Sequence, residues 1–356
     1  MSKLQKQKKL WRGAAVILLT LAVIVSVLGE VAQAYAPALN YALHTSSYKV
    51  IHDDAGEEDT EYFPSDFATA AEIVAYGAAV SEEVEAEGLV LLKNENAALP
   101  LSPGDRVSAV LQTAYSFSYG SSGSGAIDAS RYTDLKTALE SVGLVVNGTL
   151  WDFYAANPSA QAVSYSRSGD PVYKVNAMSW DDYSPEARDS VATHGGTAVA
   201  VIGRLGGEGA DVSTVKSDGY DGSYLSLTEE EIGVLAELTQ MKRAGQLDSI
   251  VVIINTAQPF ETAFLDDNWA VSLDEGNYTV DVDACLWVGN VGMAGISAAA
   301  KALVGEVVPS GRLADTYVKD NFSSPAAVSW ILQNSAGSFA GTYDDRDILS
   351  SETQTR

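Results

Sequence analysis

The sequence is poor in cysteine, histidine and positive charge, and each shortage excludes a class of protein. One cysteine in 356 residues, Cys285, rules out an intramolecular disulfide framework and a cysteine-based zinc site. It lies in an apolar run, which predicts a buried, inert thiol. The three histidines have no metal-ligand spacing, so we expect no metal and no other cofactor. With 22 Lys and Arg against 47 Asp and Glu the net charge is −25, which argues against a nucleic-acid partner but not against neutral sugars.

Familiar phosphate-binding and nucleophile motifs are missing as well. The glycine-rich run at 120–125 is not a G-x-G-x-x-G fingerprint and has no Walker lysine, so it favours a flexible loop over a phosphate cradle. No G-x-S-x-G elbow accompanies the histidines, and His194 falls at the end of a predicted helix, where a cap is expected. Paired carboxylates remain as the catalytic option.

The amino terminus is predicted to direct the chain to a membrane. Residues 1–12 are a basic segment, and residues 13–29 (GAAVILLTLAVIVSVLG) carry no charge. This run is near the short end of the spanning range of about 17–25 residues. The basic side should remain cytoplasmic, which places the body outside the cell membrane on a single-pass anchor. Cleavage after a signal-peptidase-like site at 32–34, giving a secreted protein, is the alternative.

Apolar runs alternate with helical patterns in the body of the chain. We expect a linker or arm at 30–65, a domain at 66–325 and a polar tail at 326–356. Strands are predicted at 107–111, 144–146, 198–202, 250–255 and 284–288, and helices at 66–87, 134–141, 188–194, 226–243 and 296–304. Residues 151–185 have no clear period and suggest an insertion. Strands that alternate with helices predict an α/β class protein, a three-layer α/β sandwich with a mostly parallel sheet.

The loop after the predicted strand at 198–202 is the most informative segment. Ligands in open α/β sheets bind beyond the carboxyl ends of strands, where this loop would lie. It carries three charged side chains, Arg204, Glu208 and Asp211. Its glycines, which adopt backbone conformations closed to other residues, are Gly203, Gly206, Gly207 and Gly209. An ordinary surface loop with solvated charges is equally compatible with this local chemistry.

Glycoside hydrolysis needs two carboxylates that flank the scissile bond. Glu208 and Asp211 are three residues apart in one loop and cannot approach that bond from opposite sides. A second catalytic carboxylate would therefore have to come from elsewhere.

Several segments, in order over about residues 80–318, together resemble the α/β sandwich domain of glycoside hydrolase family 3, the β-glucosidase family. They lie at 87–95 with 99–101, 123–125, 203–211, 225–227, 286–295 and 309–313. The resemblance implies retaining hydrolysis of β-glycosidic bonds with Glu208 as the acid/base. It also implies that Arg204, Gly207, Gly209 and Asp211 shape the loop or bind substrate.

In that family a TIM-type barrel supplies the nucleophile, and no segment here matches its motif. The family also has members in which the sandwich precedes the barrel, an order that suits a sandwich placed directly after a membrane segment. The missing barrel leaves three explanations: a piece of a longer enzyme, a barrel in another chain, or a non-catalytic remnant.

The expected function is the acid/base half of a β-glucosidase-like site, acting on a carbohydrate substrate and inactive as this chain alone. The alternative is a non-catalytic sugar-binding or assembly module at the cell surface. A Glu208 that is buried and paired with Arg204 would favour the alternative, and an exposed Glu208 at the mouth of the sheet would favour the enzyme.

Overall fold

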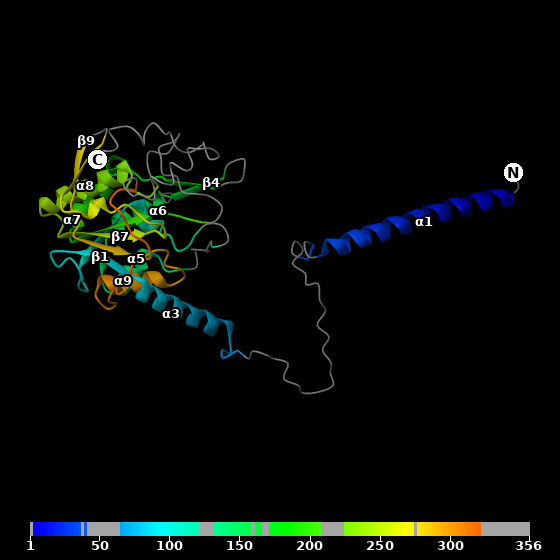
Figure 1. Cartoon of the computed structure of the whole chain (residues 1–356), viewed down its shortest axis with the longest axis horizontal. Helices are drawn as coiled ribbons and strands as arrows, with labels where there is room; N and C mark the ends of the chain where they lie inside the picture. The colour runs from blue at the N-terminus through cyan, green and yellow to red at the C-terminus, as the bar shows by residue number, and fades with distance from the viewer. Residues whose placement is uncertain are drawn as a thin grey trace. The chain divides into compact units, whose positions relative to one another are not determined.

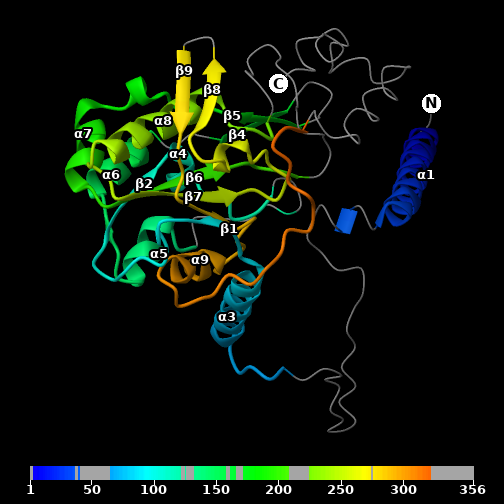
Figure 2. The same cartoon turned by 60° about the vertical axis from the view of Figure 1, so that its left-hand side comes forward.

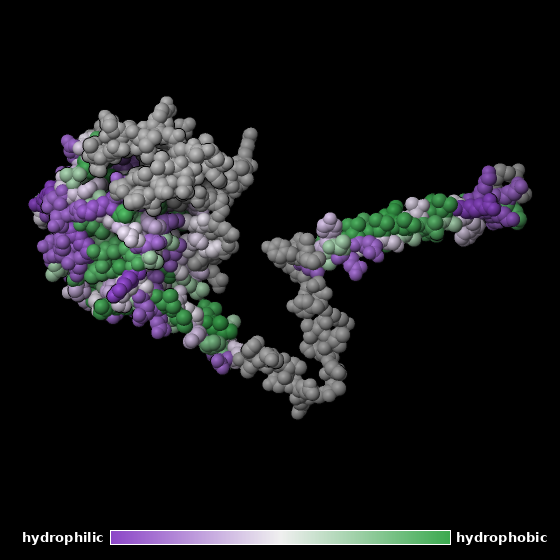
Figure 3. All heavy atoms as spheres, viewed as in Figure 1, coloured by the Kyte–Doolittle hydropathy of each residue, from purple (hydrophilic) through white to green (hydrophobic). Residues whose placement is uncertain are grey.

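The computed structural model describes residues 3–36, 39–40, 65–121, 125, 132–157, 161–165, 171–207, 224–273 and 276–321 (Figure 1). The chain forms two units, Met1–Asp66 and Phe67–Arg356. In the first unit, helix α1 runs from Lys3 to Ala34 and joins the basic and apolar segments in one helix. Its stretch Gln7–Ala34 is long and apolar enough to cross a membrane, and Figure 3 shows an apolar surface along the middle of the helix. The predicted apolar helix is confirmed, as either a membrane anchor or a signal sequence.

The second unit is built on a six-stranded sheet of order β1-β10-β7-β6-β2-β3. The strands are β1 (Val90–Asn94), β2 (Arg106–Val110), β3 (Val145–Val146), β6 (Thr197–Gly203), β7 (Ser249–Asn255) and β10 (Ala284–Trp287). Neighbouring strands are parallel except for β1, which pairs antiparallel with β10. The predicted α/β class and mostly parallel sheet are confirmed.

Helices cover both faces of this sheet, as Figure 2 shows. One face packs against α3 (Ala70–Gly88), α5 (Leu135–Ser141) and α9 (Gly295–Leu303). The other packs against α6 (Gly148–Ala156), α7 (Pro185–His194) and α8 (Glu229–Arg243). Every residue of β6 and of β7 is buried, because alternate side chains enter opposite cores. Cys285 in β10 is fully buried, and burial raises the pKa of its thiol well above the usual range, as expected for an inert residue.

Side-chain caps set the starts of the helices. Thr69 and Glu72 form a capping box at α3, and Thr228 and Glu231 form one at α8. The other short elements are α4 (Gln112–Tyr115), η3 (Trp180–Asp182) and η4 (Ala263–Leu265).

Three features differ from the sequence-based expectation. Helix α6 was not predicted and runs into the region 151–185 that was expected to be an insertion. It begins at Gly148 because the buried Asn147 caps it by accepting a hydrogen bond from the Leu150 amide. Two antiparallel hairpins lie outside the main sheet and were not predicted. They are β4 (Gln161–Tyr165) with β5 (Pro171–Val175), and β8 (Trp269–Leu273) with β9 (Gly276–Val280).

Candidate functional site

The carboxyl ends of the parallel strands meet at one edge of the sheet. The loop that follows β6 begins there, and we call residues 203–226 the glycine-rich loop. Asn255, the last residue of β7, ties the neighbouring loops together at this edge. Its Oδ1 accepts a hydrogen bond from the Ser118 amide at 2.6 Å, and its Nδ2 donates to the carbonyls of Ser118 and Gly289 at 2.9 and 2.6 Å. Because Asn255 is fully buried, this clamp holds the loops after β2 and β10 against the end of β7.

Arg204, the residue that follows β6, is fully buried and ion-paired with Glu231 of α8. Its Nη1 and Nη2 donate to the two carboxylate oxygens at 2.8 and 2.6 Å, a bidentate pair. The guanidinium carbon also lies 5.0 Å from the ring centre of Phe260 and 5.8 Å from that of Tyr224. These contacts supply the pairing and the aromatic surface that a buried cation requires.

The same guanidinium holds both ends of the glycine-rich loop. Its Nη1 donates to the Gly203 carbonyl at 2.9 Å, on the strand side. Its Nε donates to the Tyr224 carbonyl at 2.9 Å and its Nη2 to the Ser226 carbonyl at 2.8 Å, where the chain returns to α8. Arg204 therefore fixes the points at which the loop leaves and rejoins the fold.

The intervening residues 208–223 lie outside the described part of the chain, and with them Glu208, Gly209 and Asp211. The carboxylate beside Arg204 is Glu231, the third residue of α8, to which the sequence analysis assigned no role. The ion pair itself had no sequence signal, because its two members are 27 residues apart.

Gly206 and Gly207 are the described glycines of the loop proper, and Gly206 is buried. Its φ lies outside the left-handed region, so glycine is needed there for space and not for an unusual backbone. A Cβ at this position would meet the carboxamide of Gln258. Gln258 in turn donates to the Leu205 carbonyl at 3.3 Å and accepts from the Thr256 hydroxyl at 2.8 Å. The loop after β7 thus supports the base of the glycine-rich loop.

Glu261 is a titratable residue at this edge that sequence reasoning missed. Its backbone amide donates to the Leu225 carbonyl at 2.8 Å, close to the return of the glycine-rich loop. Burial raises the pKa of its carboxyl to about 6, against the lowering effect of the hydrogen bond from the Asn321 amide. Among the described residues, no three His, Cys, Asp or Glu side chains gather closely enough to hold a metal ion.

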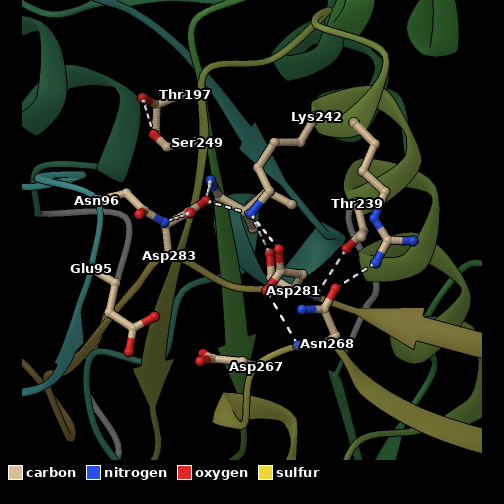
Figure 4. A network of polar contacts seen from close by, with 12 residues as sticks. Glu95, Asn96, Thr197, Thr239, Lys242, Ser249, Asp267, Asn268, Asp281 and Asp283 are labelled. Atoms are coloured by element: carbon tan, nitrogen blue, oxygen red, sulfur yellow. Dashed lines mark hydrogen bonds and ion pairs between the residues drawn. The ribbon is translucent and has the colours of Figure 1, made fainter.

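A second polar network, drawn in Figure 4, lies at the opposite edge of the sheet, where β7 and β10 begin. Lys242 contacts the carboxylates of Asp281 and Asp283 at 3.1 and 2.9 Å. Asp283 is buried and also accepts from the Ile250 amide at 2.9 Å and from Asn96 at 3.1 Å. The network joins α8 to the starts of β7 and β10.

Comparison with known proteins gives a consistent result. Residues 89–344 match the glycosyl hydrolase family 3 C-terminal domain. A β-glucosidase of Ruminococcus albus is 27% identical over 248 residues, which cover 68% of this chain and 23% of that protein.

Solved structures agree with the sequence comparison. A β-glucosidase from Paenibacillus barengoltzii superposes with a TM-score of 0.55 at 27% identity, covering 70% of this chain and 25% of that one. β-Glucosidase 3B of Thermotoga neapolitana, solved with α-D-glucose, gives a TM-score of 0.54 at 24% identity over 69% of this chain and 31% of its own. The chain thus spans about a quarter to a third of the length of these relatives.

Proposed function

The chain belongs to glycosyl hydrolase family 3, and we propose that it contributes the acid/base loop to retaining hydrolysis of β-glycosidic bonds in a carbohydrate substrate. The observation that supports this most is the anchoring of the loop after β6. Arg204 holds the strand end and the returning chain together at the ligand-binding edge of the sheet. Glu208 is four residues beyond that anchor, and we assign it the acid/base role.

A general acid must be placed within hydrogen-bonding reach of the leaving oxygen, so the scaffold that carries it has to be rigid. The bidentate pair with Glu231 and the stacking against Phe260 provide that rigidity at the base of the loop. Gly207, Gly209 and Asp211 are assigned to shaping the loop or contacting the sugar.

Retaining hydrolysis needs a second carboxylate about 5–5.5 Å from the first, which attacks the anomeric carbon. We propose that a barrel domain, in the same polypeptide or in another, supplies this nucleophile. The relatives are consistent with such a division, since this chain covers only 23% of the Ruminococcus albus β-glucosidase. Without that partner we expect this chain to hydrolyse no aryl glycoside at a useful rate.

The chain is further proposed to sit in the cell membrane through residues 13–29, with the domain outside the cytoplasm. Helix α1 and its basic first segment support this arrangement. External protease should then degrade the domain in intact cells while the chain fractionates with membranes. Soluble protein that begins near Tyr35 would instead establish cleavage and secretion.

Replacement of Glu208 by alanine in the presence of a matching barrel tests the acid/base assignment. Loss of proton transfer typically slows a reaction by about 10²–10⁴-fold. We expect a loss of this size for a glycoside with a poor alcohol leaving group and a small loss for an activated phenol, which departs without a proton. Added azide should restore part of the rate of the slowed second step.

Asp211→Ala is the matched control, and it should not show this dependence on the leaving group. Equal slowing of both substrates by Glu208→Ala, with no effect of azide, would make Glu208 a structural or sugar-binding residue.

A further inference from the structure

The β4–β5 hairpin packs against the glycine-rich loop through a small apolar cluster, which is distinct from the two cores that flank the main sheet. We call this group of residues the loop cluster. Its members are Tyr173 and Val175 of β5, Leu205 near the start of the loop, and Tyr224 with Leu225 where the chain returns to α8. The cluster therefore joins the hairpin to both ends of the segment that carries Glu208.

Two tyrosine rings form the centre of the loop cluster. Tyr173 is 3% exposed and Tyr224 is 1% exposed. Their ring centres lie 6.0 Å apart, and the ring planes are inclined by 42°. Aromatic rings at such a separation attract each other beyond the effect of burying their surface. Tyr173 is therefore part of the wall that keeps solvent away from Tyr224.

Tyr224 links this wall to the backbone of the glycine-rich loop. Its hydroxyl oxygen accepts a hydrogen bond from the Leu205 amide at 2.8 Å, and its carbonyl accepts one from Arg204 Nε at 2.9 Å. The guanidinium carbon of Arg204 also lies 5.8 Å from the ring centre of Tyr224. One residue at the return of the loop thus holds the first two residues that follow β6.

The hydrogen bond between Leu205 and Tyr224 joins two uncharged groups. Burial raises the pKa of the Tyr224 phenol to about 12, against the lowering effects of Arg204 and of the Leu205 amide. The phenol therefore keeps its proton at neutral pH. A hydrogen bond of this kind is stronger where water is excluded, so it depends on the wall that Tyr173 provides.

We propose that Tyr173 is a positioning residue for the glycine-rich loop, and that it acts through Tyr224 on the backbone of Leu205. Leu205 is three residues before Glu208, so release of its amide frees the start of the segment that presents the carboxyl. Loss of the Tyr173 ring should loosen the loop without unfolding the sheet. The catalytic consequence rests on the proposed function, whereas the contact between the hairpin and the loop does not.

Hydrogen exchange at the Leu205 amide tests this contact in the full chain, purified in detergent. Tyr173→Ala should speed this exchange by at least about tenfold, while the amides of β7 keep their wild-type rates. Tyr173→Phe keeps the ring and should match the wild type. If the alanine variant also speeds exchange in β7, Tyr173→Leu replaces it, since leucine fills more of the space. It should give an effect of about 2–10-fold at Leu205.

Two other tyrosines serve as comparison. Tyr278 of β9 is a partly buried ring in the other hairpin, so Tyr278→Ala is the matched control and should leave exchange at Leu205 unchanged. Tyr224→Phe removes the accepting oxygen but keeps the ring, and it should speed this exchange. Tyr173→Ala should add little in that background, because the hydrogen bond that it weakens is already gone.

Three results of the exchange experiment would overturn the proposal. The first is unchanged exchange at Leu205 in both Tyr173→Ala and Tyr173→Leu. The second is an equal effect of the control variant Tyr278→Ala. The third is a full effect of Tyr173→Ala in the Tyr224→Phe background, which would show that Tyr173 does not act through the Tyr224 hydroxyl.

Activity with a matching barrel separates this proposal from the proposed function. Tyr173→Ala should lower kcat more for a poor alcohol leaving group than for an activated phenol, and Tyr173→Phe should restore the rate. If Glu208→Ala shows this dependence and Tyr173→Ala does not, the positioning role is overturned and the acid/base assignment stands. If Glu208→Ala shows none while Tyr173→Ala still frees the Leu205 amide, the acid/base assignment fails and only the contact between hairpin and loop stands.

Discussion

Replacement of Glu85 by glutamine should remove a pH dependence from the stability of the fold. Glu85 lies near the end of α3 and packs against Gly295, the first residue of α9, where a Cβ would lie 2.8 Å from its Cβ and Cγ. Its Oε1 is buried and has no partner among the described residues. Burial raises the pKa of this carboxyl from 4.5 to about 8, so the folded protein keeps the group protonated at neutral pH.

The sign of the effect follows from this raised pKa. Between pH 4.5 and about 8 the unfolded chain has lost the proton and the folded protein still binds it. The contribution of Glu85 to the free energy of unfolding is therefore fully present below pH 4.5 and is lost as the pH rises through 8. The pKa difference corresponds to about 5 kcal/mol at 1.36 kcal/mol per pH unit. Because the side chain keeps some contact with solvent, we expect about half of that value.

The measurement is the free energy of unfolding by denaturant between pH 4 and 9. Through Glu85 the wild type should lose about 2–3 kcal/mol over this range. Glu85→Gln should lack this loss and keep the smaller one that the raised pKa of Glu261 contributes. Glu83→Gln, on the exposed side of the same helix, is the matched control and should behave as the wild type. Hydrogen exchange of the α3 amides separates undocking of this helix from global unfolding. A pH profile for Glu85→Gln that coincides with the wild type would refute the reasoning.

Further substitutions test the supports of the site and the polar network at the opposite edge of the sheet. Arg204→Met should cost about 3–5 kcal/mol in denaturant unfolding, because it leaves the buried carboxylate of Glu231 without its partner; a loss below 1 kcal/mol would contradict this. Gly206→Ala should cost about 1–3 kcal/mol by displacing Gln258, and Gln258→Ala should restore most of the loss. Lys242→Met should cost about 2–4 kcal/mol at pH 7, because it unpairs a buried aspartate. That loss should shrink at pH 3, and equal losses at the two pH values would contradict the ion-pair account.

The central strands and most of the helices were predictable because their sequences carry strong local signals. β6 and β7 are continuous apolar runs buried on both faces, and α8 begins at a capping box. The direction of β1 was not predictable, since a strand of five residues with only three apolar ones is compatible with either orientation in a sheet. The β8–β9 hairpin was missed because its half-buried side chains owe their burial to packing against α8, which only the tertiary fold supplies.

The candidate site was likewise predictable only in part. The loop and its place after a buried strand were predictable, because a glycine-rich segment that follows an apolar run is a local pattern. The partner of Arg204 was not, since Glu231 lies 27 residues further along the chain and no local pattern links the two. Glu261 also had no signal, because its raised pKa arises from burial in the folded structure.

The buried Arg204–Glu231 pair gives a last prediction about why the loop has such an anchor. A buried ion pair contributes little net stability, since its desolvation cost is close to its electrostatic gain, and well-packed apolar residues often replace it without loss. Its particular feature here is directional: the guanidinium donates to carbonyls at both ends of the loop, which an apolar side chain cannot do. The double variant Arg204→Met/Glu231→Leu should therefore recover the part of the loss that comes from the unpaired Glu231 carboxylate. With a matching barrel it should still lose activity on poor leaving groups, because the loop that carries Glu208 is no longer held. Full activity in the double variant would show that the anchor serves stability alone.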